Sequence, residues 1–226
     1  MTSLLKDPSW SLLKDLTIKE DSLISCFLTK KPIEDQVELH FTLEPNQKLV
    51  FTLVDYLNCS FNFLVKADLK ENSVLELNLA SLCFKDNVKS FKFDVNHLGI
   101  NTYSRTKMNG VNFSNGTLRF LGSSFIKNGA HNSDTRQEGK ITNLSPLSIS
   151  EVSPALLIKE NDVKASHGAA LGAYNPTELY YLMSRGITME ESKKLITYGS
   201  LLPIIESLKD EKLVLEAKDA LGVLKI

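Results

Sequence analysis

Three observations predict that this chain of 226 residues folds mainly as β structure and ends in a small helical domain. Apolar and polar residues alternate in successive short runs, and polar breaks separate these runs at intervals of roughly ten residues. Residues typical of helix boundaries gather after residue 174. Alternation with a period of two indicates strands that bury one face, so the body of the protein is expected to be β.

Residues 1–30 differ from the later part of the chain, because short apolar pairs there alternate with charged residues. Leu4-Leu5, Leu12-Leu13 and Leu23-Ile24 are such pairs. They show neither a strict period of two nor a sustained helical period. We therefore expect a short helical or irregular lead-in over residues 1–35.

The β body is predicted over residues 36–173. Its first five runs each place three apolar residues on one face: Val37, Leu39, Phe41; Leu49, Phe51, Leu53; Phe61, Phe63, Val65; Leu75, Leu77, Leu79; Phe91, Phe93, Val95. Polar breaks such as Glu44-Pro45-Asn46 and Asp86-Asn87 lie between them. Strand-like sequence resumes at residues 140–144 and 155–158, and the β part is expected to end near Gly172.

Two all-β architectures fit these strands, a sandwich and a parallel β-helix. Two-residue hairpin turns are scarce between the early runs, which favours a right-handed parallel β-helix whose coils stack through polar corners. Asn109-Gly110 and Asn115-Gly116 would form either a local hairpin or two tight corners. The polar stretch 127–138 is expected to be a solvated loop or a set of strand corners.

The C-terminal helical domain is predicted over residues 174–226. Asn175 is a suitable N-cap, Pro176 can occupy the first helical position, and Gly186 is expected to close this first helix. Thr188 and Glu191 have the spacing of a capping box, which predicts the start of a second helix.

The second helix is expected to stop at Gly199. Further helix is predicted from Leu201 to about Leu221. Pro203 would be tolerated only in the first turn of that helix, because proline lacks a backbone N–H donor.

Composition and charge argue against several kinds of partner. The 26 basic and 27 acidic residues are mixed along the chain and give a net charge of -1, so no broad basic field for nucleic acid is present. No apolar run approaches membrane-spanning length, and residues 1–10 contain charges and a proline where a signal peptide needs an apolar run. We expect a cytoplasmic protein that binds neither nucleic acid nor a membrane.

The sequence also argues against catalysis by this chain alone. Cys26, Cys59 and Cys83 are far apart and lack Cys-x-x-Cys spacing, unlike a disulfide framework or a self-contained metal site. No phosphate-binding loop, serine-nucleophile elbow or zinc-protease helix motif is present. Asp134, Arg136 and Glu138 could act as an acid, a base and an anchor, but charges at strand corners are more often solvated ion pairs. We assign no catalytic residue and expect a protein that is not an enzyme.

The segment 161–186 is the most informative part of the chain, since it joins the end of the strand-like sequence to a capped helix. It contains the motif Ser166-His167-Gly168-Ala169. This motif resembles the SufB and SufD family, the scaffold proteins of the SUF iron-sulfur cluster assembly system. Three further segments share the resemblance: the polar stretch 129–138, residues 154–158 and the run Tyr181-Leu-Met-Ser-Arg-Gly-Ile187. The form of the histidine motif and the lack of cysteines after Cys83 point to the SufD side.

The resemblance covers about residues 100–210 and implies a scaffold subunit. A SufB-like subunit would pair with it as a heterodimer through adjoining β-helical edges, or the chain would pair with itself as a homodimer. The C-terminal helices would dock a SufC-type ATPase, with Tyr181, Arg185 and Gly186 as candidate contacts. The long amino-terminal helical region usual in that family has no counterpart of similar length here, which identifies a short form.

The resemblance also implies the cofactors and assigns His167 to cluster assembly. A transient iron-sulfur cluster shared with SufB is expected, together with a reduced flavin in the assembled complex, and none is expected to bind tightly to the chain alone. Small neighbours leave His167 open to close approach by another subunit or a cluster. Imidazole is a competent iron ligand, yet one histidine cannot hold a cluster that ordinarily needs four protein ligands. A structural role for His167 is the alternative, and His40, His97 and His131 are expected to be ordinary histidines.

A stand-alone β-helical enzyme acting on a polysaccharide or an acyl substrate is the alternative function. Such an enzyme needs carboxylates or histidines that converge from neighbouring coils. The sequence offers no paired acids that can be placed on one face, so the scaffold is favoured.

Overall fold

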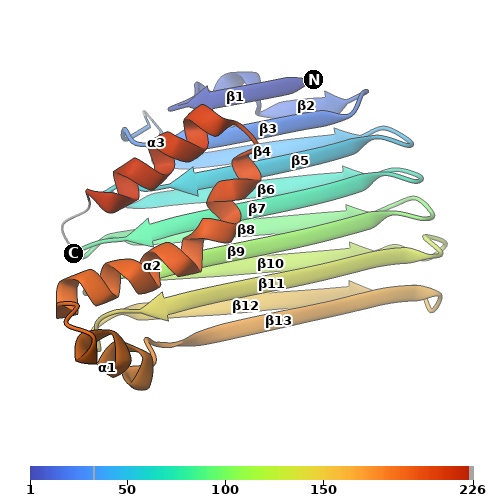
Figure 1. The fold of residues 1–226 in the computed structure, drawn as a ribbon. Coiled ribbons are helices and arrows are strands. Elements are labelled where there is room, and N and C mark those ends of the chain that lie inside the picture. Colours follow the sequence, from blue (N-terminus) through green and yellow to red (C-terminus); the bar gives the residue numbers. More distant parts are fainter. Residues whose placement is uncertain (33, 224–226) are drawn as a thin grey trace.

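In the computed structural model, which describes residues 1–32 and 34–223, two stacked parallel sheets form a β-solenoid (Figure 1). One sheet has seven strands in the order β1 (Thr2–Lys6), β3 (Ser22–Leu28), β5 (Lys48–Asp55), β7 (Val74–Cys83), β9 (Tyr103–Asn112), β11 (Ser133–Asn143) and β13 (Val163–Ala173). The other has six, in the order β12 (Ile149–Ile158), β10 (Thr117–Ile126), β8 (Val88–His97), β6 (Phe61–Leu69), β4 (Gln36–Leu43) and β2 (Asp15–Ile18).

The chain passes from one sheet to the other at every corner, so each strand pairs with the strand two positions later. All of the described strand pairs are parallel. The predicted parallel β-helix with a helical tail is therefore confirmed.

The interior between the sheets is the main hydrophobic core. The fifteen inward residues predicted from the alternation at 37–95 are all buried. Aromatic rings stack along the solenoid axis, with ring centroids 6.3 Å apart for Phe63 and Phe91 and 6.0 Å apart for Phe91 and Phe120. Such tilted and edge-on contacts add to the stability gained by burial.

The helical or irregular lead-in expected for residues 1–35 is wrong over most of its length. Strands β1, β2 and β3 lie there, and only η1 (Trp10–Leu12) is helical among the described residues of this segment. The stack of strands thus begins before residue 36. β3 is buried on both faces, because the C-terminal helical tail covers its outer face. The Ser25 hydroxyl of β3 donates a hydrogen bond to Leu208 O of that tail (2.6 Å). Burial on both faces removes the alternation on which strand prediction depends.

One corner of the solenoid is built from a ladder of asparagines. Asn46, Asn72, Asn101 and Asn132 precede successive strands of the seven-stranded sheet, and each adopts a positive φ of 55–64°. Their side-chain amides bond in series at 2.9 Å. Asparagine tolerates the left-handed conformation, and its side-chain amide forms a hydrogen bond with the side chain of the next asparagine. The spacing drifts from 26 to 29 and 31 residues, so no fixed sequence period reveals this repeat.

The predictions for the later turns were partly wrong. Asn109-Gly110 lies inside β9 rather than at a hairpin or corner, because Gly110 faces inward, where a Cβ would lie 2.6 Å from the Phe120 ring. Asn115-Gly116 does lie in a corner, between β9 and β10. The polar stretch 127–138 is a corner as far as Asn132 and then becomes β11.

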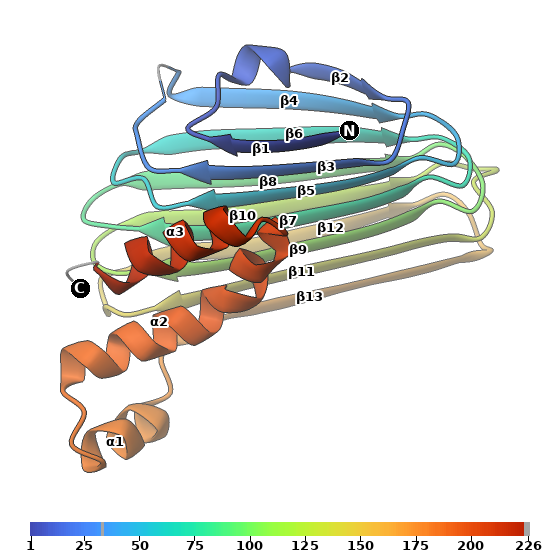
Figure 2. The ribbon, with the colours of Figure 1, turned by 45° about the horizontal axis from the view of Figure 1, so that its top comes forward.

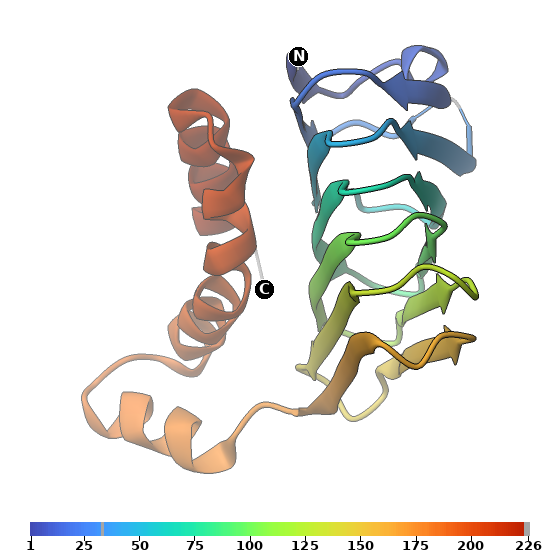
Figure 3. The ribbon, with the colours of Figure 1, turned by 90° about the vertical axis from the view of Figure 1, so that its right-hand side faces the viewer.

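Three helices follow the solenoid in the described chain: α1 (Pro176–Ser184), α2 (Met189–Ile205) and α3 (Glu211–Gly222) (Figure 2). Figure 3 shows α2 and α3 along the outer face of the seven-stranded sheet, with α1 to the side and beyond the level of β13. A second core joins this tail to the sheet and includes Phe27, Val54, Tyr56, Ala80, Leu82, Val111, Leu201, Ile204, Ile205, Leu208, Leu213, Ala217 and Leu221.

The predicted starts of the first two helices are confirmed. Asn175 accepts a hydrogen bond from Thr177 N (3.0 Å), and Thr188 and Glu191 form the reciprocal capping box. Gly186 follows α1 with a φ of +86°, a conformation that favours glycine.

The predicted end of the second helix is wrong. α2 passes through Gly199 and contains Pro203 near its C-terminal end, and the expected helix from Leu201 to Leu221 is divided into the end of α2, η2 (Glu206–Leu208) and α3. Leu201 and Ile204 are fully buried against the sheet, so tertiary burial outweighs the local cost of glycine and proline. None of the helices described has the length and apolar character needed to cross a lipid bilayer.

Candidate site at the open end of the solenoid

His167 lies on β13, the last strand of the seven-stranded sheet. In the parallel register it stands beside Gln137 of β11, whose side chain faces the interior and is 2% exposed. Neighbouring residues in a parallel register share a face, so His167 also points into the space between the sheets. Among the described residues no strand follows β13 in its sheet, and His167 is exposed.

The surroundings of His167 are small and open. Ala165 and Ala169 flank it on the inward face of β13, where Ala165 is partly exposed and Ala169 is exposed. Pro154 of β12 is half-buried on the other side of the interior. The imidazole therefore has room for a metal centre or for a side chain of another subunit.

The first end of the solenoid is closed. The segment containing η1 crosses it, Trp10 and Leu13 are 5% and 3% exposed, and the Trp10 ring centroid lies 5.2 Å from that of Phe63. These residues act as a cap on the core, as the terminal units of repeat proteins do.

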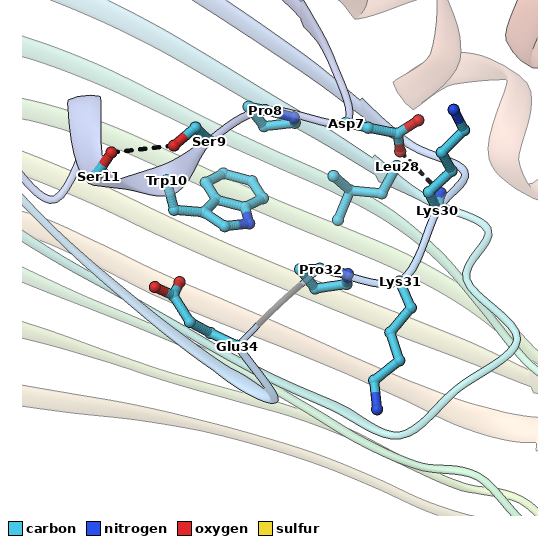
Figure 4. A pocket seen from close by; sticks show the side chains of 10 residues that line it. All are labelled: Asp7, Pro8, Ser9, Trp10, Ser11, Leu28, Lys30, Lys31, Pro32 and Glu34. Carbon is cyan, nitrogen blue, oxygen red and sulfur yellow. Dashed lines mark hydrogen bonds between the residues drawn. The ribbon is translucent and has the colours of Figure 1, made fainter.

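A pocket of about 490 Å³ lies beside this cap, lined by Asp7, Pro8, Ser9, Trp10, Ser11, Leu28, Lys30, Lys31, Pro32 and Glu34 (Figure 4). Asp7 accepts hydrogen bonds from the backbone N–H groups of Thr29 (2.6 Å) and Lys30 (2.8 Å), and Lys31 pairs with Asp35 (3.0 Å). These contacts hold the segment in place and assemble no reactive group.

The second end is not covered by any described segment. Leu171 and Ile158 face the interior at 53% and 43% exposure, whereas their register partners in the preceding coil, Ile141 and Ile126, are 1% and 0% exposed. The interior is thus open to solvent at the end of the solenoid where His167 lies. A monomer that leaves core positions exposed in this way presents an interaction surface.

The interior beneath His167 changes from apolar to polar. His97 bonds through its two ring nitrogens to Thr102 Oγ1 (2.7 Å) and Ser104 Oγ (2.9 Å), and Ser104 bonds to Thr135 Oγ1 (2.8 Å). The network continues from Thr135 to Ser124 (2.9 Å).

Gln137 connects this network to the last coil. Its Nε2 donates to Ser124 Oγ (2.7 Å) and to Ala155 O of β12 (3.1 Å). The amide therefore links β11 of one sheet to β12 of the other, directly before the layer that contains His167. The sequence did not single out Gln137, although Ser133, Thr135 and Gln137 recur with the same period of two as the apolar core residues.

Protonation of His97 is expected to destabilise the protein in mild acid. Burial lowers the pKa of His97 to about 4, although the charge of Asp134 acts in the opposite direction. The unfolded chain, with an imidazole pKa near 6.5, binds more protons between these two values. The free energy of unfolding should therefore fall by roughly 3 kcal/mol as the pH drops from 6.5 to 4.

Urea denaturation across this pH range measures the effect. In the H97Q variant, this part of the pH dependence should be absent, whereas H40Q, a change at a half-exposed imidazole on the outer face of β4, should retain it. Equal pH dependence in wild type and H97Q would contradict the assignment.

The three residues predicted at the helical tail do lie together. The Arg185 guanidinium is 5.2 Å from the centroid of the Tyr181 ring, and Gly186 follows directly. Arg185 and Gly186 also line a groove of about 590 Å³ with Ile187, Glu191, Lys194, Leu195, Tyr198, Leu221 and Gly222. His167 is six residues before the end of β13, about 20 Å along an extended strand. Tyr181, Arg185 and Gly186 therefore form a surface separate from the site around His167.

Asp134, Arg136 and Glu138 form surface ion pairs. Arg105 Nη1 lies 2.9 Å from Asp134, and Arg136 pairs with Glu138 on the outer face of β11. In the described residues no group of three or more histidine, cysteine or acidic side chains has metal-binding geometry. Burial raises the pKa of the Cys83 thiol to about 11, so this cysteine is not activated.

Comparison with known proteins places these features in a family. Residues 62–200 match the family described as SUF system FeS cluster assembly, SufBD core domain. This match spans more than half of the chain and begins well before residue 100, so it extends further toward the amino terminus than the resemblance of the motifs.

Individual relatives agree with the family match. The chain is 35% identical over 126 residues to the iron-sulfur cluster assembly protein SufD of Bacillus subtilis, covering 56% of this chain and 29% of that protein. It is 28% identical over 143 residues to the protein of the same name from Escherichia coli, covering 63% and 34%. A SufBD family protein of Pyrococcus horikoshii is 36% identical over 64 residues, covering 28% and 14%. The matched region is thus much shorter than each relative.

Proposed function

The chain belongs to the SufBD family of the SUF iron-sulfur cluster assembly system, and we propose that it acts there as a SufD-like scaffold subunit. The observation that carries this proposal is the open second end of the solenoid, where the core is exposed and His167 points into the interior. A SufB-like subunit would cover this end and form a heterodimer. The chain would contribute binding surface and a ligand rather than catalysis.

His167 is proposed to help form or hold the nascent cluster at this junction. The cluster is the cargo of the assembly, not a resident cofactor. A neutral imidazole nitrogen can bind iron, and the exposed position of His167 beside small residues leaves it accessible. The remaining ligands would come from the partner chain, since a cluster ordinarily needs four.

The helical tail is proposed to dock a SufC-type ATPase. Tyr181 is 56% exposed on the first helix of the tail, next to Arg185 and Gly186. Tyrosine and arginine are enriched where protein partners meet. ATP hydrolysis would take place on that ATPase, because this chain has no phosphate-binding loop. A reduced flavin would belong to the assembled complex, and we assign it no residue here.

We place the assembly in the cytoplasm, in keeping with three free cysteines and with the charge distribution of the sequence.

Anaerobic co-purification tests the proposal. The tagged chain would be expressed with the SufB-like and SufC-type proteins of its own cell, and the purified complex would be analysed for iron and acid-labile sulfide. All three chains are expected to elute together and to carry both elements. Elution of the folded chain without either partner would contradict the scaffold function.

A further inference from the structure

We infer that Asn115 is a site of spontaneous deamidation, a covalent modification that converts it to aspartate and isoaspartate. The chain has three Asn-Gly pairs, at 109–110, 115–116 and 128–129, and the fold protects the first and the third. The inference does not depend on the proposed function. It follows from the hydrogen bonds and the exposure of the three pairs.

Deamidation of an Asn-Gly pair is a reaction of the main chain with the asparagine side chain. The glycine nitrogen loses its proton to hydroxide or a buffer base and attacks the asparagine Cγ. A C–N bond forms, the bond from Cγ to Nδ2 breaks, and ammonia leaves. Water then opens the cyclic imide at either carbonyl, which gives aspartate or isoaspartate. Glycine favours the attack, because no Cβ hinders the approach of its nitrogen.

Asn115-Gly116 has the freedom that this reaction needs. The pair lies in the bend between β9 and β10, and the Asn115 side chain is exposed. Within the part of the chain that the structure describes, no hydrogen bond engages that side chain or the Gly116 N–H group. The carboxamide and the nitrogen that attacks it are thus both unrestrained.

Asn109-Gly110 is protected because it lies inside a strand. Asn109 is 9% exposed, and its Nδ2 donates to Ser200 O of α2 (2.8 Å). Gly110 stands between Ser81 of β7 and Ile141 of β11 in the parallel ladder. Ring closure at this pair requires both the strand and the helix contact to open, and such opening is rare in a central strand.

Asn128-Gly129 is exposed but is protected by its turn. Ala130 N donates to Lys127 O (3.0 Å), which closes a tight turn around the pair, and Gly129 has a φ of +89°. Gly129 N also donates to Glu160 Oε2 (2.8 Å). The N–H group is therefore directed to the carboxylate, whose negative charge opposes the loss of the proton.

Isoaspartate at position 115 would strain the corner that follows it, because its longer main chain adds one backbone atom before Gly116. That glycine is tightly enclosed: an added Cβ would lie 2.7 Å from Cys83 Sγ and 2.9 Å from Asn112 Oδ1. Gly116 O accepts hydrogen bonds from Asn112 Nδ2 (2.8 Å) and from Ile149 N (2.9 Å), the first residue of β12. Formation of isoaspartate therefore loosens the attachment of β12 to the preceding coil.

Peptide mass spectrometry tests the assignment on the purified full chain, aged in mildly alkaline water labelled with heavy oxygen. Each deamidation event incorporates one labelled oxygen. Asn115 should convert at least about tenfold faster than Asn109 and Asn128, which react only after local opening. In urea the three pairs should react within about threefold of one another, because no fold protects them. Equal rates in the folded chain, or the same tenfold difference in urea, would overturn the inference.

Hydrogen exchange tests the consequence for β12. The Ile149 amide should exchange at least about threefold faster in the aged wild-type chain than in the fresh chain. Aged N115Q, which cannot form the five-membered ring, and fresh N115D, which carries the charge on a normal main chain, should retain the fresh wild-type rate. An unchanged Ile149 rate in chains shown to contain isoaspartate would refute the loosening of β12.

Discussion

Replacing Lys89 with alanine should lower the free energy of unfolding by about 3–5 kcal/mol. Lys89 and Asp55 are both fully buried, with Lys89 Nζ 2.7 Å from Asp55 Oδ2. The ammonium also donates to Leu57 O (2.6 Å) and Leu82 O (2.7 Å), where strands of the two sheets meet at a corner. Its removal leaves a carboxylate and two carbonyl oxygens without their donor inside the protein, which costs more than the loss of the ion pair itself.

Urea denaturation of K89A against K66A separates burial from simple charge removal. Lys66 pairs with Glu38 at 2.6 Å on the exposed outer face, so K66A should change stability far less. The double variant D55L/K89M removes both charges, fills the space with apolar atoms and should recover much of the stability that K89A loses. A loss in K89A no greater than that in K66A would show that the buried pair is not needed.

The strands that were predicted most clearly are those that bury only one face. Strands β4, β6 and β8 alternate because only the inward face meets the core, so Phe63 and Phe91 could be assigned to it. β3 could not be recognised, because the helical tail buries its second face and its partners there lie about 180 residues away in the chain. For the same reason, the burial of Leu201 and Ile204 carries α2 past Gly199.

His167 could be predicted as the candidate site residue, but the direction and the exposure of its imidazole could not. The motif around His167 was recognised by its resemblance to a family, and the resemblance does not say which way the imidazole points. Its inward direction depends on the register with Gln137, and its exposure depends on the lack of a further described strand beyond β13. Both are properties of coil stacking, which varies in spacing from coil to coil.

Replacing His167 with alanine should leave the complex intact and reduce its iron and sulfide content by about tenfold. Alanine keeps the backbone N–H and C=O groups of β13, so the proposed contact with the SufB-like subunit should remain. The exposed imidazole makes no contact on which the fold depends, and its loss should leave the chain as stable as wild type by urea denaturation. The effect is therefore expected on the cluster alone.

The matched control is H131A, which removes an imidazole that is also exposed but lies in a corner and pairs with Glu160 at 3.3 Å. Its iron and sulfide content should equal that of wild type. H167C, which offers a thiolate at the same position, should restore part of the cluster if His167 acts as a ligand, because thiolate binds iron-sulfur clusters. Equal metal content in H167A, H131A and wild type would assign His167 to structure only, while loss of the partner from H167A would assign it to the contact between the chains.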